Sequence, residues 1–383
     1  MTSAIICSPY PDVTIPDQSL PEFVFADAAR RAAKPALIDG PSGRAITYGQ
    51  LVERARLMAG GLAARGFQPG EVFAIYCPNL PEYAVAFYGV LLAGGTTTTI
   101  NPLYTVEELT AQLNDAGASY LLTIPPFLDK AVEAAGRSGV REVLVLGEAT
   151  GATPFAALLA AGRQPPEVRI DPRRDLAVLP YSSGTTGLPK GVMLTHHNLV
   201  ANLCQLQPVV KVDEEETGVA VLPFFHAYGL SMLMAAGLWQ GGTLVTMPRF
   251  DLEQFLAILQ DHRVTPGGGG AADCARPDQA PPGPPLRPVG AAVPRLWGRA
   301  AVGRAGAGLR PAAGLCRQPG LWDDRDQPGP DHPPVEARIR HGSAGQLVPN
   351  TQAKVVDPAT GEVLGRNQDG ELCFRGPQVW PAT

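Results

Sequence analysis

The chain contains 383 residues, of which 45% are hydrophobic, and it carries a formal net charge of −5 with a sequence pI near 5.7. This length accommodates two or three domains with a large core, and an acidic balance without a basic stripe argues against a nucleic-acid-binding protein. The N-terminus has no basic stretch before an apolar segment, and no apolar run is long enough to span a bilayer. The six cysteines form no CxxC pairs, so we expect reduced thiols in a cytoplasmic protein.

The first third of the chain alternates helix and strand patterns, which predicts an α/β domain. Thr47 with Gln50 forms a predicted capping box, and apolar residues then recur on one helix face until Gly66 ends the helix. Further along the chain the patterns predict a strand over 72–76, a helix over 83–92, a second capping box at Thr105 and Glu108, and a strand over 121–123. Such strand–helix–strand units predict a doubly wound, largely parallel sheet, which binds ligands beyond the carboxyl ends of its strands.

A polar loop over residues 181–191 follows a predicted buried strand at 176–179 and is the most informative feature of the sequence. Gly184 and Gly187 permit positive φ and close backbone approach, so that successive N–H groups can surround an anion. Lys190 adds a mobile positive charge, and further donors come from the hydroxyl groups of Ser182, Ser183, Thr185 and Thr186. The spacing differs from a Walker P-loop. A surface turn is the alternative, but the density of the pattern favours a phosphate-binding loop.

Two positions further along the chain could take part in the same site. His226 lies beside Phe224, Phe225 and Tyr228. In isolation, a histidine in such surroundings is more often a packed core residue than a catalytic group. Arg249 follows an apolar run, where a solvated cation at a strand end is an equally good interpretation.

The loop and the segments 222–230 and 342–347 together resemble the AMP-forming acyl-adenylate ligase superfamily, and most closely its 4-coumarate-CoA ligase-like acyl-CoA synthetases. The resemblance covers about residues 23–265 and 338–379. It implies an α/β adenylation core, ATP-dependent activation of a carboxylic acid to acyl-AMP, and thioester formation with coenzyme A. It also implies Mg²⁺ bridging the phosphates.

The resemblance implies a role for each matching position. Lys190 and His226 would be the catalytic residues, with His226 next to the carboxylate that is activated. Tyr228 would contact the acyl group, Arg249 would contact the phosphates of coenzyme A, and Thr185 would contact Mg²⁺. The phosphates of ATP would be bound by Ser182, Ser183, Gly184, Thr185, Thr186, Gly187 and Lys190. The aromatic side chains suit an aromatic or a fatty acid equally well.

Residues 266–335 have a composition that cannot form a core. They include no Ser, Thr, Asn, Lys, Glu, Ile, Met, Phe or Tyr, and 27 of the 70 residues are Pro or Gly. Such a segment is typical of a disordered linker, yet a linker of this length inside a catalytic domain is unexpected. The resemblance further implies a Tyr-Gly-Met-Thr-Glu motif with a metal-assisting glutamate in this region, and the motif is absent.

We interpret this segment as a frameshifted translation of a GC-rich gene. Codons for residues 321–328, read one nucleotide later, can encode Tyr-Gly-Met-Thr-Glu-Thr-Ser, and the same shift lets residues 268–281 encode a run that includes Pro-Pro-Ile-Val-Leu-Ala-Leu-Thr-Lys. The synonymous codons are chosen, but Trp322 followed by Asp323 forces the shifted glycine. Resequencing the gene tests the interpretation, which fails if the frame is intact across this region.

Two short strands are predicted near the end of the chain, around 346–357 and 371–375, with turns at Asp357-Pro358 and Asp369-Gly370. One base restored before the codon of Trp380 gives Val-Met-Ala-Ser-Tyr, a continuation typical of the family. The predicted organisation is therefore an adenylation core over 1–265, a frameshifted segment over 266–337 and a truncated β-rich subdomain over 338–383. We therefore expect the family's small C-terminal domain, with its adenylation lysine, to be missing from this organisation.

Two functions of different classes remain open at this point. The chain is either an acyl-CoA ligase or an inactive, at most nucleotide-binding, fragment of one. A peptide-synthetase adenylation domain is a weaker option, because no carrier domain is visible. The expected partner is a small carboxylic acid, without nucleic acid and without a transmembrane segment.

Overall fold

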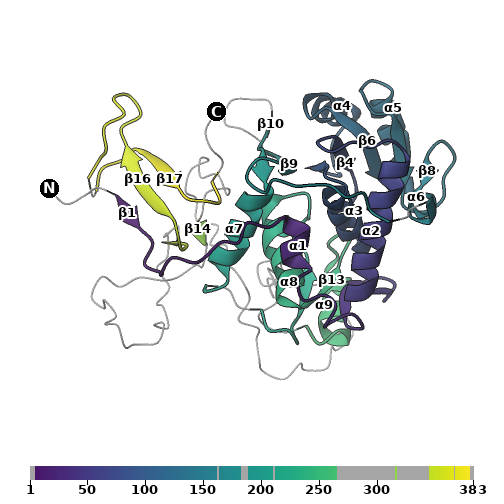
Figure 1. Cartoon of the computed structure of the whole chain (residues 1–383), viewed down its shortest axis with the longest axis horizontal. Coiled ribbons are helices and arrows are strands. Elements are labelled where there is room, and N and C mark those ends of the chain that lie inside the picture. Colours follow the sequence, from purple (N-terminus) through teal and green to yellow (C-terminus); the bar gives the residue numbers. More distant parts are fainter. Residues whose placement is uncertain are drawn as a thin grey trace.

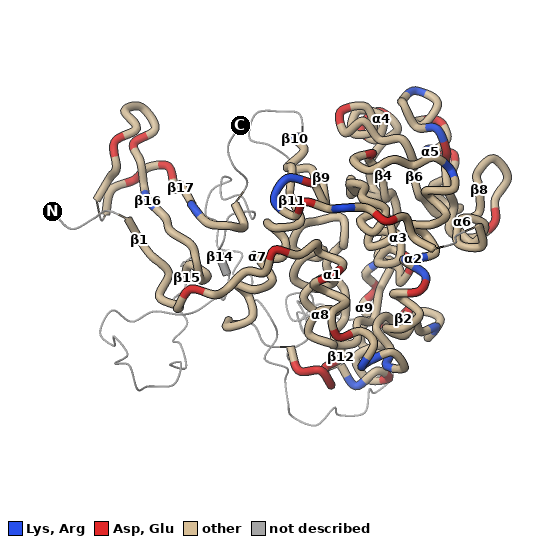
Figure 2. The backbone as a smooth tube through the Cα atoms, in the orientation of Figure 1, with Lys and Arg blue, Asp and Glu red and all other residues tan. Residues whose placement is uncertain are grey.

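The computed structural model describes residues 5–161, 164–182, 189–209, 212–264, 315–316, 345–365 and 367–379. Within these ranges no helix has the length and apolar character needed to cross a membrane. Basic and acidic residues are both scattered over the described chain (Figure 2).

An eight-stranded sheet forms the centre of the larger part of the molecule (Figure 1). Its strands, in spatial order, are β10 (Lys190–Gly191), β9 (Leu176–Ser182), β5 (Thr96–Thr99), β4 (Val72–Ile75), β6 (Ala118–Thr123), β7 (Glu142–Val145) and β8 (Thr153–Pro154), with β11 (Leu194–Thr195) also paired to β9. All neighbours from β9 to β8 are parallel, whereas β10 and β11 are antiparallel to β9. The predicted parallel sheet is confirmed.

Helices cover both faces of this sheet. Because side chains alternate along a strand, Phe73 and Ile75 of β4 join one core cluster while Ala74 and Tyr76 join another. The first cluster includes residues of α2 (Tyr48–Ala64), α3 (Pro81–Leu92) and α6 (Phe155–Ala161), and the second includes residues of α4 (Val106–Asp115) and α5 (Leu128–Ala135). The sheet is therefore doubly wound, as predicted.

Side-chain caps mark the start of several helices. The capping boxes predicted at Thr47 and Thr105 are both present, and they start α2 and α4. A further capping box starts α7 (His196–Leu206): the Thr195 side chain accepts from the Asn198 N–H, and the Asn198 side chain accepts from the Thr195 N–H. Each box satisfies backbone donors that would otherwise be left unpaired in the first turn.

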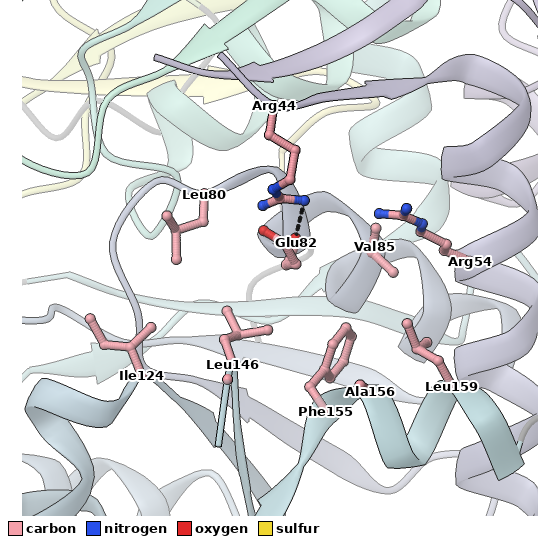
Figure 3. A pocket seen from close by; sticks show the side chains of 11 residues that line it. Arg44, Arg54, Leu80, Glu82, Val85, Ile124, Leu146, Phe155, Ala156 and Leu159 are labelled. Carbon is pink, nitrogen blue, oxygen red and sulfur yellow. Dashed lines mark ion pairs between the residues drawn. The ribbon is translucent and has the colours of Figure 1, made fainter. Parts of the chain in front are cut away.

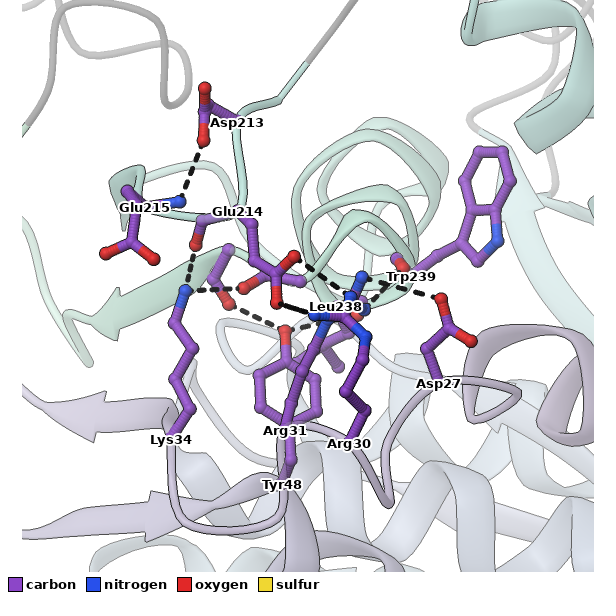
Figure 4. Close-up of polar contacts among 12 residues, drawn as sticks. Asp27, Arg30, Arg31, Lys34, Tyr48, Asp213, Glu214, Glu215, Leu238 and Trp239 are labelled. Atoms are coloured by element: carbon purple, nitrogen blue, oxygen red, sulfur yellow. Dashed lines mark hydrogen bonds and ion pairs between the residues drawn. The ribbon is translucent and has the colours of Figure 1, made fainter.

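A second sheet has the order β12 (Thr217–Ala220), β13 (Thr243–Thr246), β2 (Pro35–Asp39) and β3 (Ala45–Thr47). It packs against α8 (Ala236–Gln240) and α9 (Leu252–Asp261), and α1 (Leu20–Val24) lies beside α7 and α8. Polar contacts tie its two halves together (Figure 4). Arg31 donates to Glu214 at 2.9 Å and to the Trp239 carbonyl at 3.1 Å, and Lys34 donates to the Gly241 carbonyl at 2.7 Å.

A separate antiparallel sheet lies at one end of the molecule and contains β1 (Ile6–Cys7), β16 (Gln352–Val356) and β17 (Glu371–Arg375) (Figure 1). The strands predicted near the end of the chain are therefore present, together with β15 (Gln346–Leu347), which pairs with β14 (Leu315–Cys316). The pairing of β1 with this sheet has no counterpart in the sequence pattern. Gln205 of α7 donates to the Pro349 carbonyl at 2.7 Å and so joins this part to the helical layer.

Candidate functional site

The loop singled out by its sequence lies at the carboxyl end of β9, the edge where parallel sheets bind ligands. Its two described ends face each other, because Lys190 of β10 pairs with Ser182 of β9 and Gly191 pairs with Tyr181. Lys190 is exposed, so its ammonium group can reach a ligand in solution. The predicted phosphate-binding residues Ser183, Gly184, Thr185, Thr186 and Gly187 lie outside the described residues.

The base of this hairpin is fixed by Tyr181. Its hydroxyl donates a hydrogen bond to the carboxylate of Asp115 at the end of α4. The pKa of Tyr181 is raised, mainly because the hydroxyl is partly buried and also because of this hydrogen bond. A Cβ on Gly191 would lie 3.1 Å from the Tyr181 ring, so the glycine lets β10 pass close to the aromatic side chain. The absence of a side chain at Gly191 therefore leaves room for the pairing of β10 with β9 beside this ring.

His226 lies in a tight turn between β12 and a π-helical segment, Gly229–Ala235. Nδ1 of His226 accepts a hydrogen bond from the Tyr228 backbone N–H at 3.2 Å, which places the proton of a neutral ring on Nε2. The ring reaches solvent, but the groups packed around it partly desolvate it and lower its pKa below the ordinary value. His226 is thus an oriented, neutral donor at neutral pH, which the sequence alone did not indicate.

The backbone next to His226 contacts the sheet that carries the loop. The Phe225 carbonyl accepts a hydrogen bond of 2.8 Å from the hydroxyl of Thr99, which is the last residue of β5. In the parallel β5–β9 pair, Thr99 lies opposite Pro180, two residues before Ser182. The His226 turn and the loop at 182–190 therefore lie at the same carboxyl edge, as a shared site requires.

Tyr228 and Arg249 have different surroundings. Tyr228 is half-buried and directly precedes the π-helical segment. Arg249 is exposed and follows β13, the parallel neighbour of β12. Because β12 and β13 are parallel, His226 and Arg249 both follow the carboxyl edge of the second sheet. Arg249 is exposed there and can meet a ligand from solution.

A separate cavity of about 560 Å³ lies beyond the ends of β4, β6 and β7 (Figure 3). Its lining includes the apolar Leu80, Leu146 and Phe155, and Arg44 forms an ion pair of 2.7 Å with Glu82 at its edge. It includes none of the residues that the sequence predicted for the site. Phe155 belongs to the core cluster that includes residues of α2, α3 and α6, and Leu146 packs against that cluster.

Metal binding by protein side chains alone finds no support in the described ranges, where no group of three or more His, Cys, Asp or Glu residues could hold a metal ion. The residue predicted to contact Mg²⁺, Thr185, lies outside those ranges. The described residues of the candidate site that could contact a ligand are Lys190, His226 and backbone N–H groups.

Comparison with known proteins gives a consistent assignment. The sequence pattern of the family described as "AMP-binding enzyme" matches residues 24–266 and 329–382. The chain is 34% identical over 395 residues to 4-coumarate–CoA ligase 3 of Oryza sativa subsp. japonica, covering 97% of this chain and 69% of the relative. Residues 267–328, which the family pattern leaves unmatched, fall within the compositionally biased segment 266–335.

Solved structures show the same fold. A long-chain-fatty-acid-CoA ligase from Archaeoglobus fulgidus superimposes with a TM-score of 0.73 at 21% identity and covers 97% of this chain and 77% of its own. A benzoate CoA ligase from Burkholderia xenovorans LB400 superimposes with a TM-score of 0.70 at 22% identity, covering 94% and 72%.

Proposed function

Because the chain belongs to the AMP-binding enzyme family, we propose that it is an acid–thiol ligase that activates a carboxylic acid with ATP and transfers the acyl group to coenzyme A. In the first step a carboxylate oxygen bonds to the α-phosphorus of ATP while the bond to the β-phosphate oxygen breaks, giving acyl-AMP and pyrophosphate. In the second step the thiolate of coenzyme A bonds to the acyl carbon and AMP leaves. The observation that carries this proposal is the family match across both the 181–191 loop and the His226 turn.

Individual roles follow from charge and position. Lys190 and the loop residues stabilise the charge that develops on the β- and γ-phosphates as pyrophosphate leaves, which is the main catalytic requirement of such a displacement. Mg²⁺ enters with ATP as the substrate Mg·ATP, and Thr185 is its proposed protein contact.

His226 and its neighbours act on the acid and on coenzyme A. The Nε2–H of His226 donates to the carboxylate that is activated, and Tyr228 contacts the acyl group. Arg249 is available to a phosphate of coenzyme A. We place the reaction in the cytoplasm, because Cys77 and Cys204 are free thiols and because ATP and coenzyme A are cytoplasmic metabolites.

ATP–pyrophosphate exchange tests this function. The purified chain is assayed with Mg·ATP, labelled pyrophosphate and a panel of aromatic and fatty acids, and we expect acid-dependent label in ATP. Lys190→Ala should lower exchange about 100-fold, the usual cost of removing one charge-stabilising group. Lys130→Ala is the matched control, since Lys130 is also exposed but lies on α5. Equal activity of the two variants would remove Lys190 from the mechanism.

A fragment without ligase activity is the second candidate, favoured by the unmatched residues 267–328. This candidate predicts that the chain shows no exchange and at most binds ATP, while a gene with the frame restored over 266–335 encodes an active protein. Calorimetric ATP titration of both proteins, next to the exchange assay, separates the two functions. Exchange by the present chain contradicts the fragment.

A further inference from the structure

The backbone that leads to His226 is held by a side chain from another strand. Asn79 follows β4 and is only 4% exposed. Its Nδ2 donates to the carbonyls of Ala220 and Leu222, both at 2.9 Å, and its Oδ1 accepts from the Phe224 N–H at 2.8 Å. Both amide hydrogens and the oxygen are thus used on alternate residues of a single segment.

A second contact comes from the neighbouring strand. Thr99 ends β5, is 2% exposed, and donates to the Phe225 carbonyl at 2.8 Å. Because β4 and β5 are parallel neighbours, Asn79 and Thr99 reach the segment from adjacent carboxyl ends. Together they bond the backbone of four residues between Ala220 and Phe225, and His226 is the next residue.

Among the residues that the structure describes, few other hydrogen bonds hold this segment. The His226 N–H bonds the Pro223 carbonyl at 3.1 Å and the Leu230 N–H bonds the His226 carbonyl at 2.9 Å, but both contacts lie within the turn itself. Phe224 is fully buried and packs edge-on against Tyr83 at 5.5 Å between ring centroids. The packing of Phe224 keeps the segment in the core. The hydrogen bonds from Asn79 and Thr99 are directional, so they also fix how the backbone of the segment is oriented.

We infer that Asn79 and Thr99 are positioning residues that set the orientation of His226 towards the acid. This inference rests on the role given to His226 in the proposed function. Neither side chain needs to touch a reacting atom, because the effect passes through the backbone of residues 220–225. A displacement of about 1 Å in a catalytic group can lower a rate by about 100-fold, so such backbone anchors are significant for the reaction.

Strand β5 offers a matched pair of substitutions. Thr97 lies two residues before Thr99, so their side chains point to the same face, and both are almost fully buried. The Thr97 hydroxyl has no hydrogen-bond partner in the described structure, whereas the Thr99 hydroxyl holds Phe225. Thr99→Val and Thr97→Val therefore make the same isosteric change, and only the first removes a contact to the segment.

The first readout is independent of activity. The imidazole of His226 is followed by NMR as pH is changed, with its resonance assigned by comparison with His226→Gln. In Thr99→Val we expect the pKa of His226 to move towards the ordinary value, because a released turn is better solvated, while Thr97→Val retains the wild-type titration. The same titration curve in all three proteins overturns the inference.

The second readout is exchange kinetics. Thr99→Val should lower kcat about tenfold while leaving KM for ATP within about twofold, since the nucleotide contacts lie in the separate 182–190 loop. Thr97→Val should match the wild type. A kcat unchanged in Thr99→Val overturns the inference if His226→Gln is impaired. If wild type shows no exchange at all, the proposed function fails, while the NMR comparison still decides whether Thr99 orients the turn.

Asn79→Leu tests the larger contact and needs a control for stability. Its loss leaves two carbonyls and one N–H without partners, and each unsatisfied buried group destabilises a fold. Gln205→Leu is the control, because Gln205 is a fully buried amide that bonds the Pro349 carbonyl and not the His226 segment. At a matched loss of melting temperature, only Asn79→Leu should shift the His226 titration. The same shift in both variants would assign it to general loosening and contradict the inference.

Discussion

His196 is a buried histidine whose ring must remain neutral in the folded protein. It is 1% exposed at the first turn of α7, and its Nδ1 accepts the backbone N–H of Leu20 at 3.1 Å. Burial lowers the pKa of His196 to about 4, although the charges of Asp175 and Glu22 act in the opposite direction. Protonation at Nδ1 would both charge a buried ring and break the bond that holds the start of α1.

This histidine predicts a loss of stability in mild acid. In the unfolded chain His196 titrates near its ordinary pKa of about 6.5, so below that pH the unfolded state binds a proton that the folded state does not. The contribution of His196 is complete above about pH 6.5 and falls as pH approaches 4, with a limit of about 3 kcal/mol. Urea unfolding at pH 7.5 and pH 5 measures it.

Two substitutions separate His196 from other titrating groups. His196→Gln keeps an acceptor for Leu20 but cannot be protonated, so its free energy of unfolding should depend less on pH. His262→Gln, at the end of α9, should retain the wild-type dependence. Equal pH dependence in both variants would place the effect on other groups.

At the scale of single elements, the turn after His226 depends on a glycine. A Cβ on Gly229 would lie 2.1 Å from the Pro223 carbonyl oxygen, which is backbone and cannot rotate away. Gly229 is the first residue of the π-helical segment, and π-helical turns are frequent at functional sites. The close approach lets the segment fold back onto the residues before His226.

Gly229→Ala is therefore expected to destabilise the protein by about 1–3 kcal/mol through overpacking. Gly237→Ala is the matched control, because the nearest atoms to its Cβ would belong to the movable side chain of Leu244, at 3.3 Å, and alanine favours the helix α8 by about 1 kcal/mol. Thermal unfolding of the two variants measures the difference. Equal stabilities would show that the turn can relax around a methyl group.

The elements differ in how far the sequence predicts them. Capping boxes at Thr47 and Thr105 fix helix starts within a few residues, because the cap and its partner are three positions apart in the chain. The parallel sheet follows from alternating strands and helices. The bonds from Asn79 and Thr99 join residues more than 120 positions apart, and no local pattern marks them. The π-helical geometry is equally invisible to apolar periodicity.

At the scale of the whole molecule, the N-terminal strand β1 completes the sheet formed by β16 and β17. Ile6 pairs with Ala353, the Ser8 N–H bonds the Thr351 carbonyl at 3.1 Å, and the Asn350 side chain exchanges two bonds with the Val13 backbone. Without β1, the described remainder of this sheet is a two-stranded hairpin, which is marginally stable at best in water.

Removal of residues 1–9 should therefore loosen that sheet selectively. We expect faster amide hydrogen exchange across residues 352–356 and 371–375, while the core strands β4 and β6 remain protected as in the full chain. Mass spectrometry of peptic peptides resolves these regions. Unchanged protection of β16 and β17 would show that packing against α7, through contacts such as that of Gln205, suffices to hold them.

The two strands of the β1–β16 pair are synthesised at different times, because they lie near opposite ends of the chain. A ribosome that adds about 5–20 residues per second completes the partner strand roughly half a minute after β1 has emerged. During that time the hydrogen-bonding edge of β1 is available to other strands, and contacts between such distant residues form slowly. Of the described sheets, this one is therefore the last for which all strands have been synthesised.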